Sequence, residues 1–243
     1  MRGSERGRRL GGKVCVVTGA GRGIGRAVAL TFAREGGALA LCARTLGELE
    51  ETAAEARRFG AEVVFDACDV TEAAQVGRFM GRVLTRGRVD VLVNNAGIGD
   101  PGTSLANTSP EGWDRVMAVN LRGPFLFARA VLPGMMGQRS GSLINVSSRL
   151  GRIAGATFPT YGVSKWALEG FTRYLAAEVA PFGIRVNSVS PGLVATRLNG
   201  FVGAPPESVT ELFVFLASDA AAHVTGMALD VASWQQEIGA AAP

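Results

Sequence analysis

A glycine-rich loop near the start of the chain is the feature that most constrains its fold. An apolar run over residues 13–18 predicts a short strand, and the loop 19–25, Gly-Ala-Gly-Arg-Gly-Ile-Gly, follows it directly. A helical pattern over 26–35 comes next, two glycines end it, and a second apolar run over 38–43 predicts another strand. Strand, helix and strand in this order form a βαβ unit, in which the two strands are parallel.

The same alternation continues along the rest of the chain. Further apolar runs predict strands at 62–68, 89–93, 142–146, 184–189 and 227–231. Helical patterns separate them, at 46–59, 71–85, 110–119, 122–138, 161–180 and 209–217. Uniformly apolar strands that alternate with helices predict an α/β fold, a doubly wound parallel sheet with helices on both faces.

Polar motifs follow five of these predicted strands, at the point where each strand ends. They are the loop 19–25, Asp69, the stretch 94–97, the serines at 147–148 and the pair at 191–192. Ligands of open parallel sheets bind beyond the carboxyl ends of the strands. We therefore expect the five motifs to meet in one site at that edge of the sheet.

Length and composition favour one domain. The chain has 243 residues, of which 47% are hydrophobic, and no proline- or serine-rich linker divides it. We expect a flexible basic tail at 1–11 and a single domain over 12–243. The tail holds arginines at positions 2, 6, 8 and 9, which could touch nucleic acid or a membrane. A solvated tail is the simpler interpretation, so we expect neither partner.

Cysteine and histidine usage argues against a metal site and against secretion. Cys15, Cys42 and Cys68 fall in apolar, strand-like segments without metal-ligand spacing, and His223 is the only histidine. These thiols are expected to be core residues in a reducing compartment. The chain shows no apolar stretch of about 18 residues and no signal-peptide core after its basic start. We therefore expect a soluble cytoplasmic protein without a metal.

The glycine loop has the spacing of a phosphate-binding loop. It departs from Gly-x-Gly-x-x-Gly but fits Thr-Gly-x-x-x-Gly-x-Gly, as Thr18, Gly19, Gly23 and Gly25. Glycines at these positions let the backbone approach a pyrophosphate at the N-terminus of the following helix. Because the loop follows a strand and opens a helix, we interpret it as a dinucleotide site rather than as a simple turn.

An arginine takes the place that an acidic residue holds in many dinucleotide sites. The second strand ends at Ala43-Arg44, and the planar guanidinium of Arg44 suits a ribose 2′-phosphate. Arg22 in the glycine loop is a second candidate for the same phosphate. The pattern favours NADP(H), with NAD(H) possible; the alternative is that both arginines are solvated surface residues.

Tyr161 and Lys165 are four residues apart, so their side chains share one face if the segment is helical. A nearby ammonium favours the phenolate and lowers the pKa of a tyrosine. A serine hydroxyl could hold a substrate oxygen beside the phenol, and the three groups could then move a proton to or from that oxygen. Taken alone, the pair also fits an exposed tyrosine and a solvated lysine, and the other motifs favour the catalytic interpretation.

Together these motifs resemble the short-chain dehydrogenase/reductase family, in particular its oxoacyl-carrier-protein reductase-like members. The resemblance covers nearly the whole chain and rests on 18–25, Asp69-Val70, Asn94-Asn-Ala-Gly97, Asn120, Ser148, Tyr161-x-x-x-Lys165 and Pro191-Gly192. It implies a single Rossmann-type domain with a seven-stranded parallel sheet. It also implies an enzyme that transfers a hydride between a nicotinamide and a carbonyl or secondary alcohol.

The resemblance implies a role for each motif residue. Tyr161 would be the general acid/base, Lys165 would lower its pKa and hold the nicotinamide ribose, and Ser148 would orient the substrate oxygen. Ser148, rather than Ser147, stands at the family's distance before the tyrosine. Asn120 would hold a water of the proton relay. The other cofactor contacts would come from Gly19, Arg22, Gly23, Ile24, Gly25, Arg44, Asp69, Val70, Asn94, Ala96, Gly97, Pro191, Gly192, Val194 and Thr196.

Two other functions fit parts of the pattern, and both concern what the site does rather than its fold. One is an NAD(H)-dependent alcohol dehydrogenase of the same family. The other is a non-catalytic nucleotide-binding scaffold, against which the complete set of asparagine, serine, tyrosine and lysine argues.

The resemblance further implies a homo-oligomer, a tetramer or a dimer, that pairs through the helices at 122–138 and 161–180 and through the last strand. The first of these helices carries more apolar side chains than one face is expected to bury within a subunit. They are Phe125, Leu126, Phe127, Val131 and Leu132.

The chain departs from the family pattern after Pro191-Gly192. The family usually has a long lid there, whereas residues 193–204 of this chain lead directly to the next predicted helix. Gly200 and Gly203 would make the short segment flexible. We expect an open, shallow substrate cleft, because a short lid covers less of the substrate. Its apolar wall would include Ile98, Leu150, Phe158 and Leu193.

Overall fold

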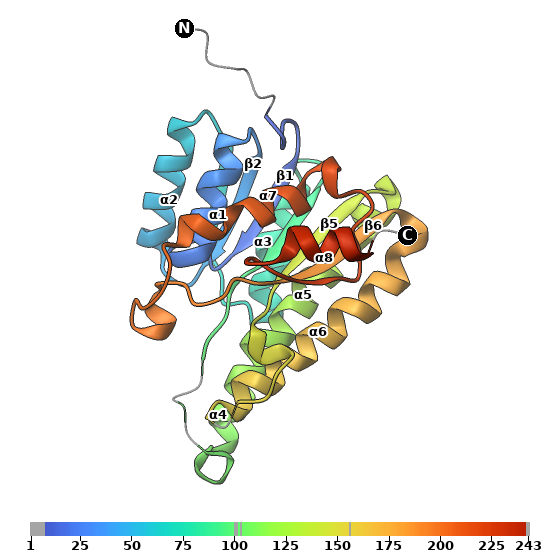
Figure 1. Cartoon of the computed structure of the whole chain (residues 1–243). Helices are drawn as coiled ribbons and strands as arrows, with labels where there is room; N and C mark the ends of the chain where they lie inside the picture. The colour runs from blue at the N-terminus through green and yellow to red at the C-terminus, as the bar shows by residue number, and fades with distance from the viewer. Residues whose placement is uncertain (1–7, 100–101, 103, 156, 242–243) are drawn as a thin grey trace, which may run out of the picture.

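The chain folds around one seven-stranded parallel sheet, which confirms the predicted fold class (Figure 1). The computed structural model describes residues 8–99, 102, 104–155 and 157–241. The strands lie in the order β3-β2-β1-β4-β5-β6-β7. The order reverses between β1 and β4, and this reversal is where open α/β sheets bind their ligands.

The strands are short and consist mainly of buried apolar residues, as expected for a sheet covered on both faces. They are β1 (Val14–Thr18), β2 (Ala38–Ala43), β3 (Val63–Ala67), β4 (Val91–Asn94), β5 (Gly141–Val146), β6 (Ile184–Ser190) and β7 (Ala228–Asp230). In the centre of the sheet, Val17 pairs with Val93, and Val93 pairs with Ile144. This register aligns the carboxyl ends of β1, β4 and β5, from which three of the predicted motifs start.

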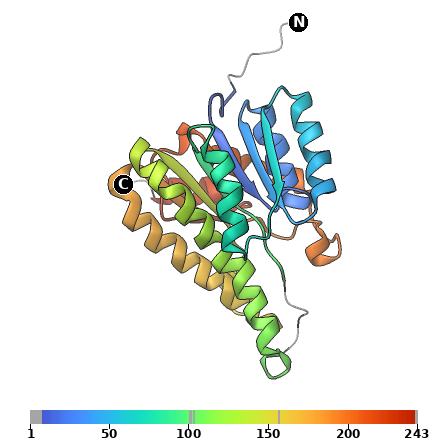
Figure 2. The ribbon, with the colours of Figure 1, turned by 180° about the vertical axis from the view of Figure 1, so that it is seen from behind.

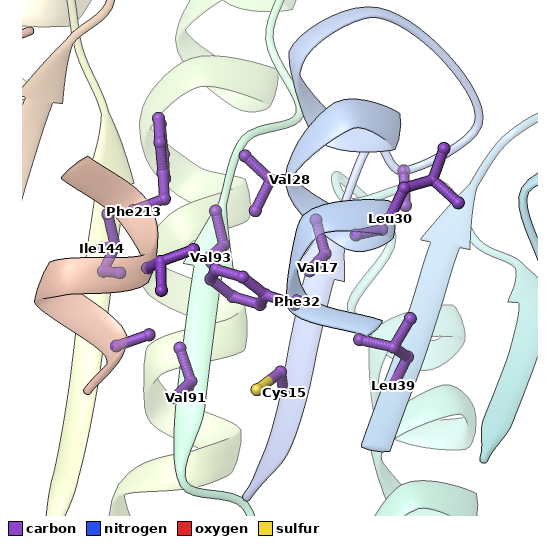
Figure 3. Close-up of a cluster of buried hydrophobic side chains, with 14 of the residues drawn as sticks. Cys15, Val17, Val28, Leu30, Phe32, Leu39, Val91, Val93, Ile144 and Phe213 are labelled. Atoms are coloured by element: carbon purple, nitrogen blue, oxygen red, sulfur yellow. The ribbon is translucent and has the colours of Figure 1, made fainter. Parts of the chain in front are cut away.

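Helices cover both faces of the sheet (Figures 1 and 2). One face holds α1 (Gly23–Arg34), α2 (Leu46–Arg58) and α7 (Thr210–Ala217), and the other holds α3 (Ala73–Leu84), α5 (Gly123–Gln138) and α6 (Pro159–Val179). Figure 3 shows the core of the first face, where Phe32 of α1 and Phe213 of α7 pack over Val93. Each face therefore has its own apolar core, with the sheet between them.

The three cysteines are buried and carry free thiols. Cys15 belongs to the core beneath α1 and α7, while Cys42 and Cys68 belong to the core beneath α3 and α5. Burial raises the pKa of the Cys15 and Cys42 thiols above their usual range, because a thiolate would lose its hydration there. Their positions agree with the prediction that they serve as small core residues.

The helix that precedes β5 differs from the predicted pair of separate helices. Helix α4 (Pro110–Met117) runs without a break through a π-helical turn, Ala118–Arg122, into α5. Ser109 caps α4 by accepting a hydrogen bond from the Gly112 amide at 3.0 Å, and Pro110 starts the helix, as predicted. Residue patterns do not signal a π-turn, because the flanking segments are ordinary helix on both sides.

Residues near both ends of the described chain pack against the domain. Leu10 is fully buried, and Arg9 forms ion pairs with Glu35 at 2.6 Å and Glu211 at 2.5 Å, so the folded part starts before the predicted boundary at Gly12. The rest of the predicted tail, 1–7, lies outside the described residues. After β7, a helix that the sequence did not predict, α8 (Trp234–Ala241), packs the Trp234 ring 4.8 Å from that of Phe215.

Candidate active site

A groove of about 400 Å³ lies at the carboxyl edge of the sheet, and residues from all five predicted motifs line it. The predicted residues that line it are Gly19, Arg22, Gly23, Ile24, Arg44, Asp69, Val70, Ala96, Gly97, Ser148, Tyr161, Lys165, Pro191, Gly192, Val194 and Thr196. Gly25, Asn94 and Asn120 lie behind this lining. The structure thus brings together motifs that are up to about 180 residues apart in sequence.

The glycine loop is held in place by the motif after β4. The Asn95 side chain donates to the Thr18 and Gly19 carbonyl oxygens at 2.9 and 3.2 Å, and the Asn95 amide donates to the Thr18 hydroxyl at 3.0 Å. A Cβ at Gly25 would lie 2.3 Å from the Gly19 oxygen, so only glycine fits there. Gly25 therefore serves close packing. Asn94 is buried in the sheet and donates to Asn145 at 2.9 Å, and it is not among the residues that line the groove.

The groove has the form of a dinucleotide cradle at the end of α1. Gly19 and Gly23 have φ angles of +65° and +55°, which bend the loop around the start of the helix. No side chain among the described residues caps the first amides of α1. These amides and the positive end of the helix dipole suit a pyrophosphate.

The two arginines predicted to meet a 2′-phosphate line the same part of the groove but differ in their surroundings. Arg44 is exposed and, within the described residues, forms no ion pair. Arg22 is already engaged, because its Nη1 lies 2.9 Å from both carboxylate oxygens of Glu48. Asp69 faces the groove while one of its oxygens accepts hydrogen bonds from the Thr71 amide and hydroxyl at 2.9 and 2.8 Å.

Ser148, Tyr161 and Lys165 meet at the opposite end of the groove. Ser148 lies just after β5, whereas Tyr161 and Lys165 stand one turn apart on α6. Burial raises the pKa of the Tyr161 phenol, and a hydrogen bond with Ser148 lowers it in part. The net direction is the opposite of the one expected from Lys165 alone. The reason is burial, which removes water from the phenolate, while the lysine Nζ lies over the tyrosine ring, 5.5 Å from its centre.

Lys165 is a buried cation. Its side chain is enclosed between α6 and β5, and Nζ donates to the Val146 carbonyl oxygen at 2.8 Å. Burial lowers its pKa to about 8, and the carboxylate of Glu169, one turn further along α6, acts against this shift. Glu169 is itself buried, accepts a 2.5 Å hydrogen bond from Ser188, and lies 3.6 Å from Nε of Arg152.

Asn120 lies in the π-turn, and its side chain makes three hydrogen bonds. Its Oδ1 accepts from the Ile98 amide at 2.9 Å, and its Nδ2 donates to the Ile98 carbonyl at 2.9 Å and to Ser164 at 3.0 Å. These bonds tie the segment after β4 to α6. The side chain therefore joins two walls of the groove, and a water at Asn120 would have to meet the main chain.

The segment after β6 forms a loop whose two ends pair with each other. Val194 and Ala204 form a β-bridge, and Asn199 donates to the Val194 and Val202 carbonyl oxygens at 2.9 and 2.7 Å. A Cβ at Gly203 would lie 2.3 Å from the Leu193 oxygen, so this glycine serves a tight turn rather than flexibility. Residues 196–199 line the groove, while Leu193, Leu198, Phe201 and Val202 are more than half exposed. The predicted open cleft stays a prediction.

Three side chains that the sequence did not single out contribute to the site. Asn95 stood next to predicted residues in the Asn-Asn-Ala-Gly motif, so its place after β4 was a usable signal. Glu48 and Glu169 offered none, because an acidic residue on a helix is usually solvated. In the described part of the chain, no three acidic, cysteine or histidine side chains gather as a metal site, and no helix has the length and apolarity to cross a membrane.

The lowered pKa of Lys165 predicts how stability depends on pH. The folded chain releases this proton near pH 8, and the unfolded chain near 10.5. Between these values the unfolded state binds more protons, so the contribution of Lys165 to stability rises with pH, by up to about 3 kcal/mol. The unfolding free energy of wild type, minus that of Lys165→Met, should rise from pH 7.5 to pH 10 in urea titrations. A constant difference would contradict the buried, deprotonating lysine.

Comparison with known proteins places the chain in a family. Residues 13–206 match the short chain dehydrogenase family. The 3-oxoacyl-[acyl-carrier-protein] reductase FabG of Thermotoga maritima is 36% identical over 241 residues, covering 92% of this chain and 97% of that protein. A solved structure from Beutenbergia cavernae with bound NADP has a TM-score of 0.87 at 33% identity, covering 95% and 99% of the two chains. Carveol dehydrogenase from Mycobacterium avium, solved with NAD, has a TM-score of 0.88 at 27% identity, covering 92% and 97%. The chain therefore belongs to the short-chain dehydrogenase/reductase family, whose members are oxidoreductases that act on CH–OH or C=O groups with a nicotinamide cofactor.

Proposed function

We propose that this protein is an NADP(H)-dependent carbonyl reductase with Tyr161 as its general acid/base. One observation carries the proposal: Ser148, Tyr161 and Lys165 line the same groove as the glycine loop and Arg44. When bound, the nicotinamide supplies or accepts the hydride at the substrate carbon. The remaining work, which is to orient the substrate and to move a proton at its oxygen, belongs to side chains of this chain.

Proton transfer is assigned to the hydroxyls of Tyr161 and Ser148. The Ser148 hydroxyl donates to the Tyr161 oxygen, and a bound carbonyl oxygen would take over the serine proton while it accepts from the phenol. Because burial raises its pKa, the phenol is protonated near neutrality and is ready to donate. Lys165 then stabilises the phenolate that forms, since its ammonium group lies beside the ring.

Asn120 is assigned the water that returns a proton to the site. Its side chain is already bonded to Ile98 and Ser164, so the water would be held by the main-chain carbonyl. In a π-turn each amide bonds to a carbonyl one residue further away than in an α-helix. This shift favours a main-chain carbonyl near Asn120 that is available to a water.

The substrate is proposed to be a partly apolar ketone or secondary alcohol. Ile98 lines the groove, and Phe158 and Leu193, which stand close in sequence to the lining residues Tyr161 and Gly192, are 41% and 62% exposed. Exposed apolar side chains beside a polar site suit a ligand that covers them. The three buried free thiols suit a reducing compartment, which supports a cytoplasmic location.

Replacing the phenolic hydroxyl tests the assigned acid/base. Tyr161→Phe should lower kcat for ketone reduction by about two to four orders of magnitude, because the proton donor is lost. Its Kd for NADPH, measured by fluorescence titration, should stay within about threefold of wild type. Tyr174→Phe is the matched control, because Tyr174 is the only other tyrosine and is 84% exposed. Full activity of Tyr161→Phe would refute the assignment.

The open guanidinium of Arg44 supports a preference for NADPH. A charge-assisted bond to the 2′-phosphate is worth about 1.5–3 kcal/mol, or roughly ten- to a hundredfold in affinity, and Ala43 offers NAD(H) no side-chain acceptor. Arg44→Ala should therefore reduce the ratio of kcat/KM for NADPH to that for NADH. Arg58→Ala, at the other end of α2, should leave the ratio unchanged. Equal kcat/KM for both cofactors in the wild type would count against the preference.

We also propose a homo-oligomer that pairs through α5 and α6. Leu126, Phe127 and Val131 turned out to be buried within the subunit, so they do not supply the surface. We propose that an apolar groove between the helices supplies the pairing surface. Its walls include Met117, Leu121, Phe125, Ala167 and Phe171. Two apolar side chains of α6 add to this surface: Val163 and Trp166 are 44% and 52% exposed.

The mass in solution tests this pairing. Light scattering at micromolar concentration should give two or four times the chain mass of 25.3 kDa. Phe125→Glu places a charge in the apolar groove and should lower the measured mass, whereas Phe201→Glu, on the segment after β6, should not. A wild-type protein that measures as a monomer would rule the proposal out.

A further inference from the structure

Glu48 places a carboxylate at the part of the groove where Arg22 and Arg44 also lie. It belongs to the first turn of α2, and about three-quarters of its side chain is buried. Both of its carboxylate oxygens accept hydrogen bonds from Nη1 of Arg22 at 2.9 Å, and one lies 3.8 Å from Nη2 of Arg197. One acidic side chain therefore joins an arginine of the glycine loop to an arginine of the segment after β6.

The backbone that carries Glu48 cannot move away from the groove without cost. A Cβ at Gly21 would lie 2.9 Å from Cβ of Glu48, so the glycine loop and the first turn of α2 are in close contact. Thr52, one turn later, donates to the Glu48 carbonyl at 2.9 Å and lies 3.4 Å from the Gly21 carbonyl. The Cβ of Glu48 therefore stays next to the loop whatever rotamer the side chain adopts.

A fixed negative charge at this place disfavours a second one. If NADP(H) binds as proposed, its 2′-phosphate reaches Arg22, the arginine that Glu48 holds. The phosphate would have to share or displace the bidentate contact on Arg22, and its charge would be repelled by the carboxylate. The 2′-hydroxyl of NAD(H) is neutral and meets neither obstacle.

We propose that Glu48 is a specificity-determining residue that weakens binding of 2′-phosphorylated dinucleotides by competing for Arg22. This rests on the proposed use of NADP(H), in which Arg44 supplies the attraction. Glu48 opposes it, so the discrimination between NADPH and NADH is smaller than Arg44 alone would give. Removing the charge at position 48 should therefore strengthen binding of the phosphorylated cofactor, a gain that misfolding cannot produce.

The test compares two small probes that differ only in the 2′-phosphate, 2′,5′-ADP and 5′-AMP, together with NADPH and NADH. Binding to Glu48→Gln is measured by isothermal titration calorimetry at low salt. Affinity for 2′,5′-ADP and NADPH should rise about three- to fivefold, the upper range for one surface ion pair. Affinity for 5′-AMP and NADH should stay within about twofold.

Glu50→Gln is the matched control, because it removes the same charge from the same helix at an exposed residue that does not line the groove. It should leave all four affinities unchanged. Unchanged affinity of Glu48→Gln for 2′,5′-ADP, or a loss of NADH binding, would overturn the inference. A wild type that prefers NADH would refute the proposed cofactor preference, while the shift caused by Glu48→Gln would still decide the role of Glu48.

Discussion

The hydrogen bond from Lys165 to the Val146 carbonyl is the contact on which the catalytic end of the groove depends. It joins α6, which carries Tyr161, to the end of β5, which leads into Ser148. Burial of an ammonium group is costly, and it is tolerated here because a carbonyl oxygen and the carboxylate of Glu169 lie close to it. The same burial that lowers the lysine pKa to about 8 keeps the cation next to the Tyr161 ring.

Amide side chains hold the rest of the edge together. Asn95 bonds the end of β1, Asn94 bonds Asn145 on the neighbouring strand, and Asn145 bonds Thr172 of α6 at 2.9 Å. Asn120 ties the segment after β4 to the π-turn and to α6. An asparagine both donates and accepts, so each can join two backbone segments that a single sheet ladder does not connect. The groove is thus preorganised by buried polar side chains with satisfied partners.

The sequence predicted those features that depend on the spacing of apolar residues and on the residues that end helices and strands. Apolar runs, helix periodicity and strand-end motifs were enough for the parallel sheet and for the meeting of Gly19, Ser148 and Tyr161 at one edge. Features that depend on tertiary contacts could not be predicted from the sequence. The π-turn at Asn120, the inward Asn94 and the pairing of Arg22 with Glu48 are set by neighbours distant in sequence, which residue patterns do not reveal. The pKa of Tyr161 also depends on burial, so the neighbouring lysine alone gave the opposite direction.

The two ends of the groove have different electrostatic tasks. At the Arg44 end, three arginines of the groove, Arg22, Arg44 and Arg197, lie with the carboxylate of Glu48, and we propose that these charges select the cofactor. At the Tyr161 end, a buried cation lies beside a hydroxyl pair, which we propose stabilises charge on a substrate oxygen. The central claim is that hydride and proton meet at one carbonyl between these ends. Incubating wild type with NADPH deuterated at nicotinamide C4 and a panel of ketones tests it by mass spectrometry of the alcohols. The account predicts one deuterium at the carbinol carbon when the transferred face of the nicotinamide carries the label. It would be contradicted if the alcohol held no deuterium with either face labelled, or if no ketone gave an alcohol although NADPH was bound.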